Sequence, residues 1–124
     1  MASFTAGDTV LASGLRQDGR NRSNLAIVVQ SATQQSRFRV ELVDGRTGAL
    51  AKTIEAVAPG SIYGVPSRIQ LDSVFQGTGV RFGWARVVRT SSDRNPFFAY
   101  AVVNDGAAPG LGSGDGTYLP GIPR

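Results

Sequence analysis

The chain has 124 residues and a formal net charge of +4, and it contains no Cys and no His. The missing residue types exclude disulfide bridges, zinc sites built on Cys or His, thiol nucleophiles and imidazole bases. This length suits one domain with one core, and no apolar run approaches the roughly 20 residues that cross a bilayer, so we expect a single domain over residues 1–124 without membrane insertion.

The apolar residues come in short runs, which Gly, Pro, Asp and Asn interrupt about every 8 to 12 residues. This spacing is typical of an all-β sandwich or barrel. The expected strands cover, in chain order, residues 8–14, 23–30, 37–43, 49–57, 67–75, 80–90 and 97–103, with a short edge strand within 117–123. About seven or eight strands in this length fit a two-sheet antiparallel sandwich of the immunoglobulin-like kind better than a closed barrel.

The clearest alternation lies at residues 37–43 (RFRVELV). Phe38, Val40 and Leu42 are apolar, and the residues between them are charged. Successive side chains of a strand point to opposite faces, so this run predicts one buried and one solvated face. The turn sequence DGRTG follows and leads into residues 49–57, which predicts a β-hairpin around an Asp-Gly turn.

Residues 97–103 (FFAYAVV) are apolar on both faces of the strand that they predict. Phe98, Tyr100 and Val102 would face one way, and the residues between them the other. An edge strand with one solvated face would not be apolar on both. The run therefore predicts a central strand, or one whose outer face is covered by the chain or by a partner, and a glycine-rich loop over residues 106–116 follows it.

Two carboxylates are associated with the glycine-rich loop: Asp105 directly precedes it, and Asp115 lies near its end. Oxygen ligands of this kind are the ones that Ca²⁺ prefers, but two Asp residues so far apart are few for a tight site. Asp also stabilises turns for local reasons. We favour the turn interpretation, with Ca²⁺ kept as the alternative and no other cofactor expected.

Four aromatic residues are candidates for a platform on which sugar rings stack: Tyr63, Trp84, Tyr100 and Tyr118. Trp84 and Tyr100, however, lie in segments where aromatic and aliphatic residues alternate as they would in a sandwich core. Core packing is the simpler interpretation of both segments. A carbohydrate-binding module that uses these aromatic residues is therefore the second hypothesis for function.

All basic residues except Lys52 are arginines, and most of them are scattered along the chain. The tightest group, RQDGRNR, holds Arg16, Arg20 and Arg22 and also an acidic residue. Nucleic-acid binding is better supported by a basic stripe interleaved with exposed aromatic residues. A polyanion contact at this group is the third hypothesis, and nucleic acid is not an expected partner.

Catalysis by a carboxylate pair would need one carboxyl group in an apolar pocket and a second at a fixed distance from it. Most Asp residues instead fall in or beside expected turns, and no pair stands out. We therefore do not expect an enzyme, and we predict no catalytic residue.

Several segments occur in an order that resembles a known domain: NRSNLAIVV, FRVELVDGRTGAL, IQLDSVF, GWARVV, NPFFAYAVVND and DGTYLP. Over residues 20–120 the chain is similar to a β-sandwich domain that occurs at the C-terminal ends, or as repeats, of secreted bacterial proteins of mostly unassigned function. It departs from that pattern at GAAPGLGSG, which is longer than the usual turn. The resemblance implies an extracellular or cell-surface accessory module, with no chemistry to transfer.

The sequence thus predicts a non-catalytic structural, adhesion or self-assembly module of an exported bacterial protein. It would associate with proteins, either copies of itself or other domains, through exposed strand edges and apolar faces. The terminal segments MASFTAGDTV and TYLPGIPR are the ones that we expect to dock on a neighbour. Because MASFTAGDTV lacks the charged start and apolar middle of a signal peptide, the chain would be a mature segment or a cytoplasmic protein.

Overall fold

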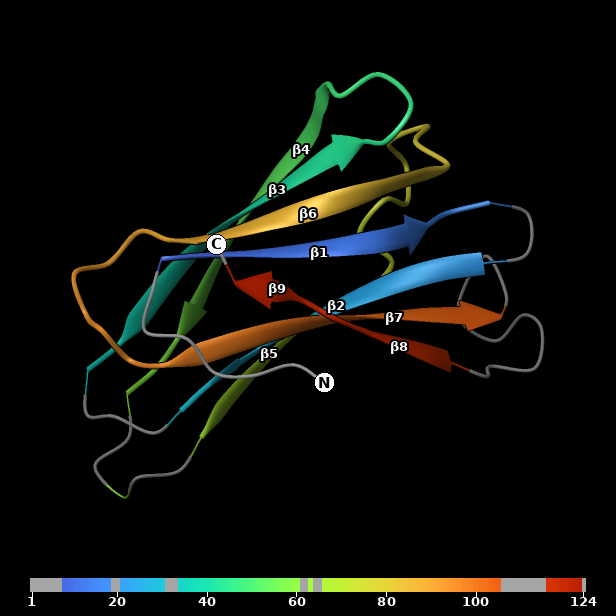
Figure 1. Ribbon diagram of the computed structural model, residues 1–124. Helices are drawn as coiled ribbons and strands as arrows, with labels where there is room; N and C mark the ends of the chain where they lie inside the picture. Colours follow the sequence, from blue (N-terminus) through green and yellow to red (C-terminus); the bar gives the residue numbers. More distant parts are fainter. Residues whose placement is uncertain are drawn as a thin grey trace.

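The computed structural model of the chain describes residues 8–18, 21–30, 34–60, 63, 66–105 and 116–123. The strands are β1 (Thr9–Arg16), β2 (Asn21–Val29), β3 (Ser36–Asp44), β4 (Leu50–Ala58), β5 (Ser67–Leu71), β6 (Phe82–Arg89), β7 (Phe97–Asp105), β8 (Gly116–Pro120) and β9 (Ile122–Pro123). They form a five-stranded sheet in the order β4-β3-β6-β1-β9 and a four-stranded sheet in the order β5-β2-β7-β8 (Figure 1). Every pairing is antiparallel.

The prediction of an all-β, two-sheet antiparallel sandwich is confirmed. No helix long and apolar enough to cross a membrane occurs among the described residues. The predicted hairpin is the β3–β4 pair, and β7 is a central strand, because it lies between β2 and β8. The inner side of β7 is apolar because it faces the core between the sheets. The outer side of β7 is apolar as well, although it does not face the core.

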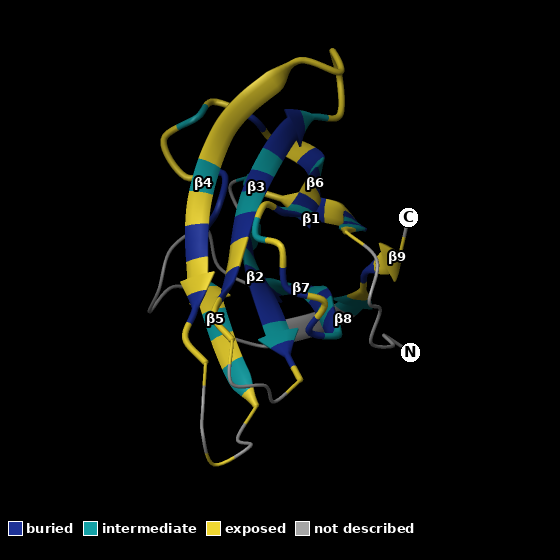
Figure 2. Cartoon of the chain, turned by 90° about the vertical axis from the view of Figure 1, so that its left-hand side faces the viewer, coloured by how far each residue is buried: buried dark blue, intermediate teal, exposed yellow. Residues whose placement is uncertain are grey.

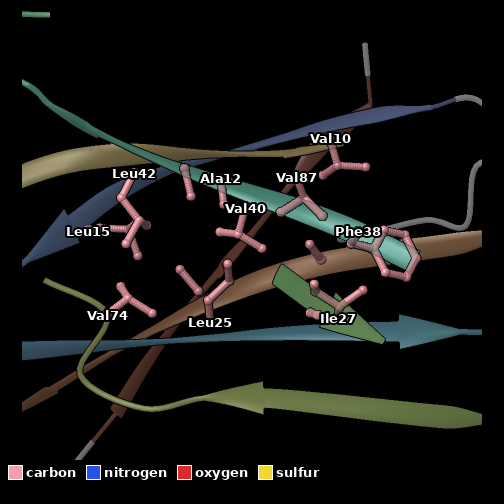
Figure 3. Packing of buried hydrophobic residues seen from close by; sticks show 14 of the residues in the cluster. Val10, Ala12, Leu15, Leu25, Ile27, Phe38, Val40, Leu42, Val74 and Val87 are labelled. Carbon is pink, nitrogen blue, oxygen red and sulfur yellow. The ribbon is translucent and has the colours of Figure 1, made fainter. Parts of the chain in front are cut away.

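The core lies between the two sheets, and the alternation in β3 decides which of its faces is buried. Phe38, Val40 and Leu42 are fully enclosed. Leu25 and Ile27 of β2 face them from the opposite sheet (Figure 3). Each such side chain stabilises the fold by roughly 1.5–3 kcal/mol when it is removed from water. Figure 2 shows the same alternation as bands of buried and exposed residues along β3 and β6.

One end of the sandwich is closed by a turn that the sequence pattern suggested was a strand. The expected strand over residues 67–75 ends at Leu71. Ser73 then adopts a positive φ of 47°, and its backbone N–H donates to Oδ1 of Asn24 at 2.8 Å. The following Val74 and Phe75 turn inward and are buried, with Val74 beside Leu15 in Figure 3. Their apolar character therefore comes from filling the end of the core.

The C-terminal segment forms two short strands in different sheets, where the sequence predicted one edge strand. β8 pairs with β7, and β9 pairs with β1. The chain changes sheets at Gly121, whose N–H donates to the carbonyl oxygen of Ala99 at 2.8 Å. A Cβ atom at this position would lie 2.5 Å from the same oxygen, so only glycine permits the crossing. The described parts of both terminal segments thus pair within the chain's own sheets rather than remaining free for a neighbour, and residues 1–7 lie outside the described residues.

Candidate ligand-binding site

A hollow of about 540 Å³ lies at one end of the five-stranded sheet. It opens where β1 ends, β6 begins and the β3–β4 turn approaches them. These parts of the chain lie toward the right of Figure 1. The side chains that give the hollow its chemical character are Ser13, Arg16, Asp18, Arg81, Phe82 and Trp84. Sites for small ligands have volumes of about 300–1,000 Å³ and combine apolar walls with a few polar groups, so this hollow has the size and composition of a binding site.

A β-bulge in β1 shapes the hollow. Ala12 is opposite Ala85 and Leu15 is opposite Gly83, so three steps along β1 match two along β6. The extra residue is accommodated at Gly14, whose φ of 79° lies in the left-handed region that favours glycine. The bulge leaves Ser13 exposed and directs the residues that follow it toward the start of β6.

Backbone hydrogen bonds fix the two arginines of the hollow. The buried hydroxyl of Ser23 accepts from the N–H of Arg16 at 2.6 Å and donates to the carbonyl oxygen of Arg16 at 3.0 Å. The carbonyl oxygen of Arg81 accepts from the N–H of Gln17 at 2.8 Å. Both arginines are exposed, and within the described part of the chain neither guanidinium group makes an ion pair or a hydrogen bond. Their donors are therefore available to a ligand.

Asp18 is the acidic residue of the hollow. Its carboxylate accepts from the backbone N–H of Asn21 at 2.8 Å and from the Asn21 side-chain amide at 3.2 Å. This contact holds the carboxylate at the turn that follows β1. The hollow therefore combines two guanidinium groups with one carboxylate, and its formal charge is positive.

Phe82 and Trp84 provide the apolar wall. They occupy alternate positions on β6, so both side chains lie on the outer face of the sheet. Phe82 is 50% exposed, and Trp84 is half-buried. Trp84 also borders a smaller hollow of about 210 Å³, whose lining includes Val43 and Leu50. Trp84 therefore stands between two depressions on the outer face.

The four aromatic residues that were candidates for one sugar platform do not share a face. Trp84 lies on the outer face of the five-stranded sheet, and Tyr100 on the outer face of the four-stranded sheet. Tyr63 follows β4 and is 84% exposed, and the side chain of Tyr118 lies outside the described residues. The core-packing interpretation is wrong for Trp84 and Tyr100, because their neighbours along the strands take the buried positions.

A second apolar surface lies on the outer side of the four-stranded sheet. Phe98 and Tyr100 stack with their ring centroids 6.0 Å apart. Val28 and Ala26 of β2 lie directly opposite them. The guanidinium carbon of Arg68 lies 5.9 Å from the centroid of the Tyr100 ring. We refer to the following five residues as the β7 face: Ala26, Val28, Phe98, Tyr100 and Val102.

The three arginines predicted to contact a polyanion are not brought together. Arg16 lies at the hollow on the five-stranded sheet, whereas Arg22 belongs to β2 in the other sheet, where it alternates with the inward-facing Ser23. Arg20 lies outside the described residues. The structure instead brings Arg16 to the same hollow as Arg81, which is distant in sequence.

The residues of the Ca²⁺ hypothesis lie almost entirely outside the described part of the chain. β7 ends at Asp105, whose side chain is outside the described residues, as is the whole of Asp115. Within the ranges that the structure describes, no three Asp or Glu side chains gather closely enough to hold a metal ion. A calcium site at Asp105 and Asp115 stays a prediction.

A buried polar network closes the end of the sandwich opposite Val74. A guanidinium nitrogen of Arg89 donates to the Asp93 carboxylate at 3.0 Å and to the Asp93 carbonyl oxygen at 2.9 Å. The hydroxyl of Ser36 donates to the same carboxylate at 2.6 Å, and the Ser91 hydroxyl donates to its other oxygen. Arg89 also lies over the ring of Phe97, with its guanidinium carbon 5.0 Å from the centroid. This enclosed network connects β6 to the start of β7 and is structural.

The Asp93 carboxyl group is held in its ionised form. Burial opposes ionisation and would raise its pKa, but the hydrogen bonds from Ser36, Ser91 and the backbone of Asn95, together with the charge of Arg89, outweigh burial. The pKa of Asp93 therefore lies below its ordinary value. The group is a paired ion and not a proton donor or acceptor tuned for chemistry near neutral pH.

Comparison with known proteins supports the fold and gives no information on function. No protein-family model matches the chain, and no curated protein matches it. A crystal structure described as that of Thermotoga maritima 1070 is similar, with a TM-score of 0.60, 10% sequence identity, and coverage of 94% of this chain and 91% of that one. At this identity the similarity concerns the β-sandwich alone.

Sequence reasoning did not single out Phe82 or Arg81. The alternation in VRFGWARVV was the available signal, because it assigns Phe82, Trp84 and Arg86 to one face of a strand. The contribution of Arg16 to the same hollow depends on the pairing of β1 with β6 and on the bulge at Gly14. Neither of those features follows from local pattern.

Proposed function

We propose that this chain is a non-catalytic structural and adhesion module of an exported bacterial protein, and that it associates with further copies of itself. The observation that carries the proposal is the β7 face, on which a central strand presents Phe98, Tyr100 and Val102 outward. These three side chains are half-buried, and contiguous apolar side chains on the outside of a sheet are typical of association surfaces. The resemblance to domains of secreted proteins supports the exported location, and the lack of His and Cys supports a non-catalytic role.

The edge strands have features that obstruct the addition of a further strand, and this favours association through a sheet face. On β4, Lys52 is opposite Leu42 and Leu50 is opposite Val43, so Ala51 is the extra residue of a bulge. Lys52 consequently shares the inner side of the sheet with Leu42, and inward charges and bulges both obstruct the addition of a strand.

The other edge strands are short or contain proline. β5 has five residues, and β9 has two, one of which is Pro123. β8 ends at Pro120. Proline has no N–H to donate to a new strand, and short strands offer few groups to pair with. A docking neighbour therefore gains more from the β7 face than from any of these edges.

The size of the face indicates a weak contact for each copy. The β7 face spans two strands about 4.8 Å apart, over about five residues of about 3.3 Å each, and covers roughly 160 Å². A stable interface buries about 800 Å² on each partner. One pair of modules therefore associates weakly, and several modules in a host protein would gain strength from multivalency.

Sedimentation equilibrium of the purified chain over a wide concentration range tests the proposal. The weight-average mass should rise above that of the monomer as the concentration increases. In the double variant Phe98→Thr/Val102→Thr it should stay at the monomer value, because the apolar surface is reduced while β-branched residues keep the strand.

The matched control is Val57→Thr, which removes exposed apolar surface from β4 in the other sheet. It should self-associate as the unmodified chain does. A strictly monomeric unmodified chain at all concentrations, or equal loss of association in the Val57→Thr variant, would refute the proposal.

A further inference from the structure

We infer that the hollow beside Trp84 binds a carboxylated sugar residue, such as a uronic acid unit of an acidic polysaccharide. This site is independent of the proposed self-association, because it lies on the five-stranded sheet and the β7 face lies on the other one. The inference rests on three properties of the hollow: an aromatic wall, two guanidinium groups that have no partner among the described residues, and one acidic group.

The aromatic wall suits the apolar face of a sugar ring. Phe82 and Trp84 are two residues apart on one strand, so their attachment points are about 7 Å apart on the same face. The C–H face of a pyranose ring is apolar and covers an aromatic ring of this kind, while the sugar's hydroxyl groups remain at its periphery. Phe82 is 50% exposed, so its ring is accessible for such a contact.

The charged groups of the hollow favour a ligand that carries a single carboxylate group. Arg16 and Arg81 make no ion pair within the described residues, and a guanidinium group binds a carboxylate through two parallel hydrogen bonds. Asp18 offers an acceptor for sugar hydroxyl groups, and Ser13 offers a hydroxyl group at the opposite side of the bulge. The hollow thus complements a ligand that carries both hydroxyl groups and one negative charge.

The same composition argues against a nucleic acid as the ligand. A phosphate backbone places negative charges close together and is bound by several cations along a groove. The hollow has two arginines, and the carboxylate of Asp18 beside them would repel a second phosphate. A mixed donor and acceptor set of this kind matches a carbohydrate better.

The fluorescence of Trp84 provides a direct test, because it is the only tryptophan of the chain. The probe is a short oligogalacturonate, and its fully methyl-esterified form serves as the uncharged analogue. We expect saturable change of the Trp84 emission with oligogalacturonate. The Arg16→Gln and Arg81→Gln variants should each bind it roughly tenfold more weakly, since each loses a charge-assisted hydrogen bond. Both substitutions replace exposed side chains, so the variants should keep the circular dichroism spectrum of the unmodified chain.

Arg68→Gln is the matched control, because it removes the same charge from the four-stranded sheet. It should leave the affinity unchanged. Equal binding of the methyl-esterified analogue, preference for a single-stranded oligonucleotide, equal weakening by Arg68→Gln, or no response to any probe would each overturn the inference.

Discussion

Gly14 determines the shape of the hollow at the scale of a single residue. Its φ of 79° lies in the left-handed region, and a Cβ atom there would lie 2.8 Å from Cδ1 of Leu119. Gly48, in the β3–β4 turn, has a similar φ of 75°, but a Cβ atom there would meet nothing within 4 Å. A side chain at either glycine would strain the backbone, but only a side chain at Gly14 would also overlap a neighbouring residue. Comparing the two positions therefore distinguishes the energetic cost of backbone strain from that of steric overlap.

We predict that Gly14→Ala lowers the free energy of unfolding by about 2–3 kcal/mol and Gly48→Ala by about 1 kcal/mol. Both variants carry the strain of a left-handed backbone, and Gly14→Ala must also displace Leu119. Urea denaturation followed by circular dichroism measures both values. An equal decrease in the free energy of unfolding of the two variants would contradict this prediction, because the overlap with Leu119 would then cost nothing.

The local sequence pattern identified some of the residues of the hollow, but it could not predict that they lie together. Trp84 and Arg16 were both singled out from the sequence, but under two different hypotheses, a glycan surface and a polyanion contact. They line the same hollow because a bulge in β1 and the β1–β6 register bring them together. Pairing between distant segments is a tertiary property, so neither composition nor spacing contains it.

At the scale of elements, strands with one solvated face were the easiest to predict. The alternation in β3 follows from burial of Phe38, Val40 and Leu42, and its period of two appears in the sequence. The run from Ser67 to Phe75 misled the prediction, because Val74 and Phe75 are buried by a turn. The change of sheet at Gly121 depends on close approach to Ala99 and has no local signature beyond the glycine.

The connection between β6 and β7 depends on the ion pair of Arg89 and Asp93. The side chains of both residues are buried, with relative exposures of 0% and 2%. We predict that Asp93→Asn lowers the free energy of unfolding by about 3–5 kcal/mol at neutral pH, because the charge of Arg89 stays buried without a counter-charge. Glu55→Gln, an exposed change on β4, is the control and should cost less than about 0.5 kcal/mol.

The same pair makes the stability of the fold sensitive to acid. The pKa of Asp93 is lower in the folded chain than in the unfolded chain, so the stabilisation is present above the unfolded pKa of about 4 and is lost as the pH falls through the folded pKa. The unfolding free energy of the unmodified chain should therefore fall steeply below about pH 4. The Asp93→Asn variant should show a flatter profile there. Parallel profiles for the two proteins would contradict this assignment.

At the scale of the whole molecule, the two sheets present different outer surfaces. The four-stranded sheet presents the stacked rings of Phe98 and Tyr100. The five-stranded sheet presents the hollow beside Trp84, flanked by arginines. In a host protein, such a module would contact its own copies with one side and an acidic glycan with the other. These two surfaces could work at the same time, because they lie on opposite sides of one core.

NMR over a dilution series is the sharpest test of self-association through the β7 face. Two-dimensional ¹H–¹⁵N spectra of the unmodified chain, recorded from high to low concentration, report which backbone amides change environment. We predict that the concentration-dependent shifts are centred on Phe98, Tyr100 and Val102 and on the facing residues of β2. Shifts confined to β4 amides, or spectra that do not change with concentration, would contradict the claim.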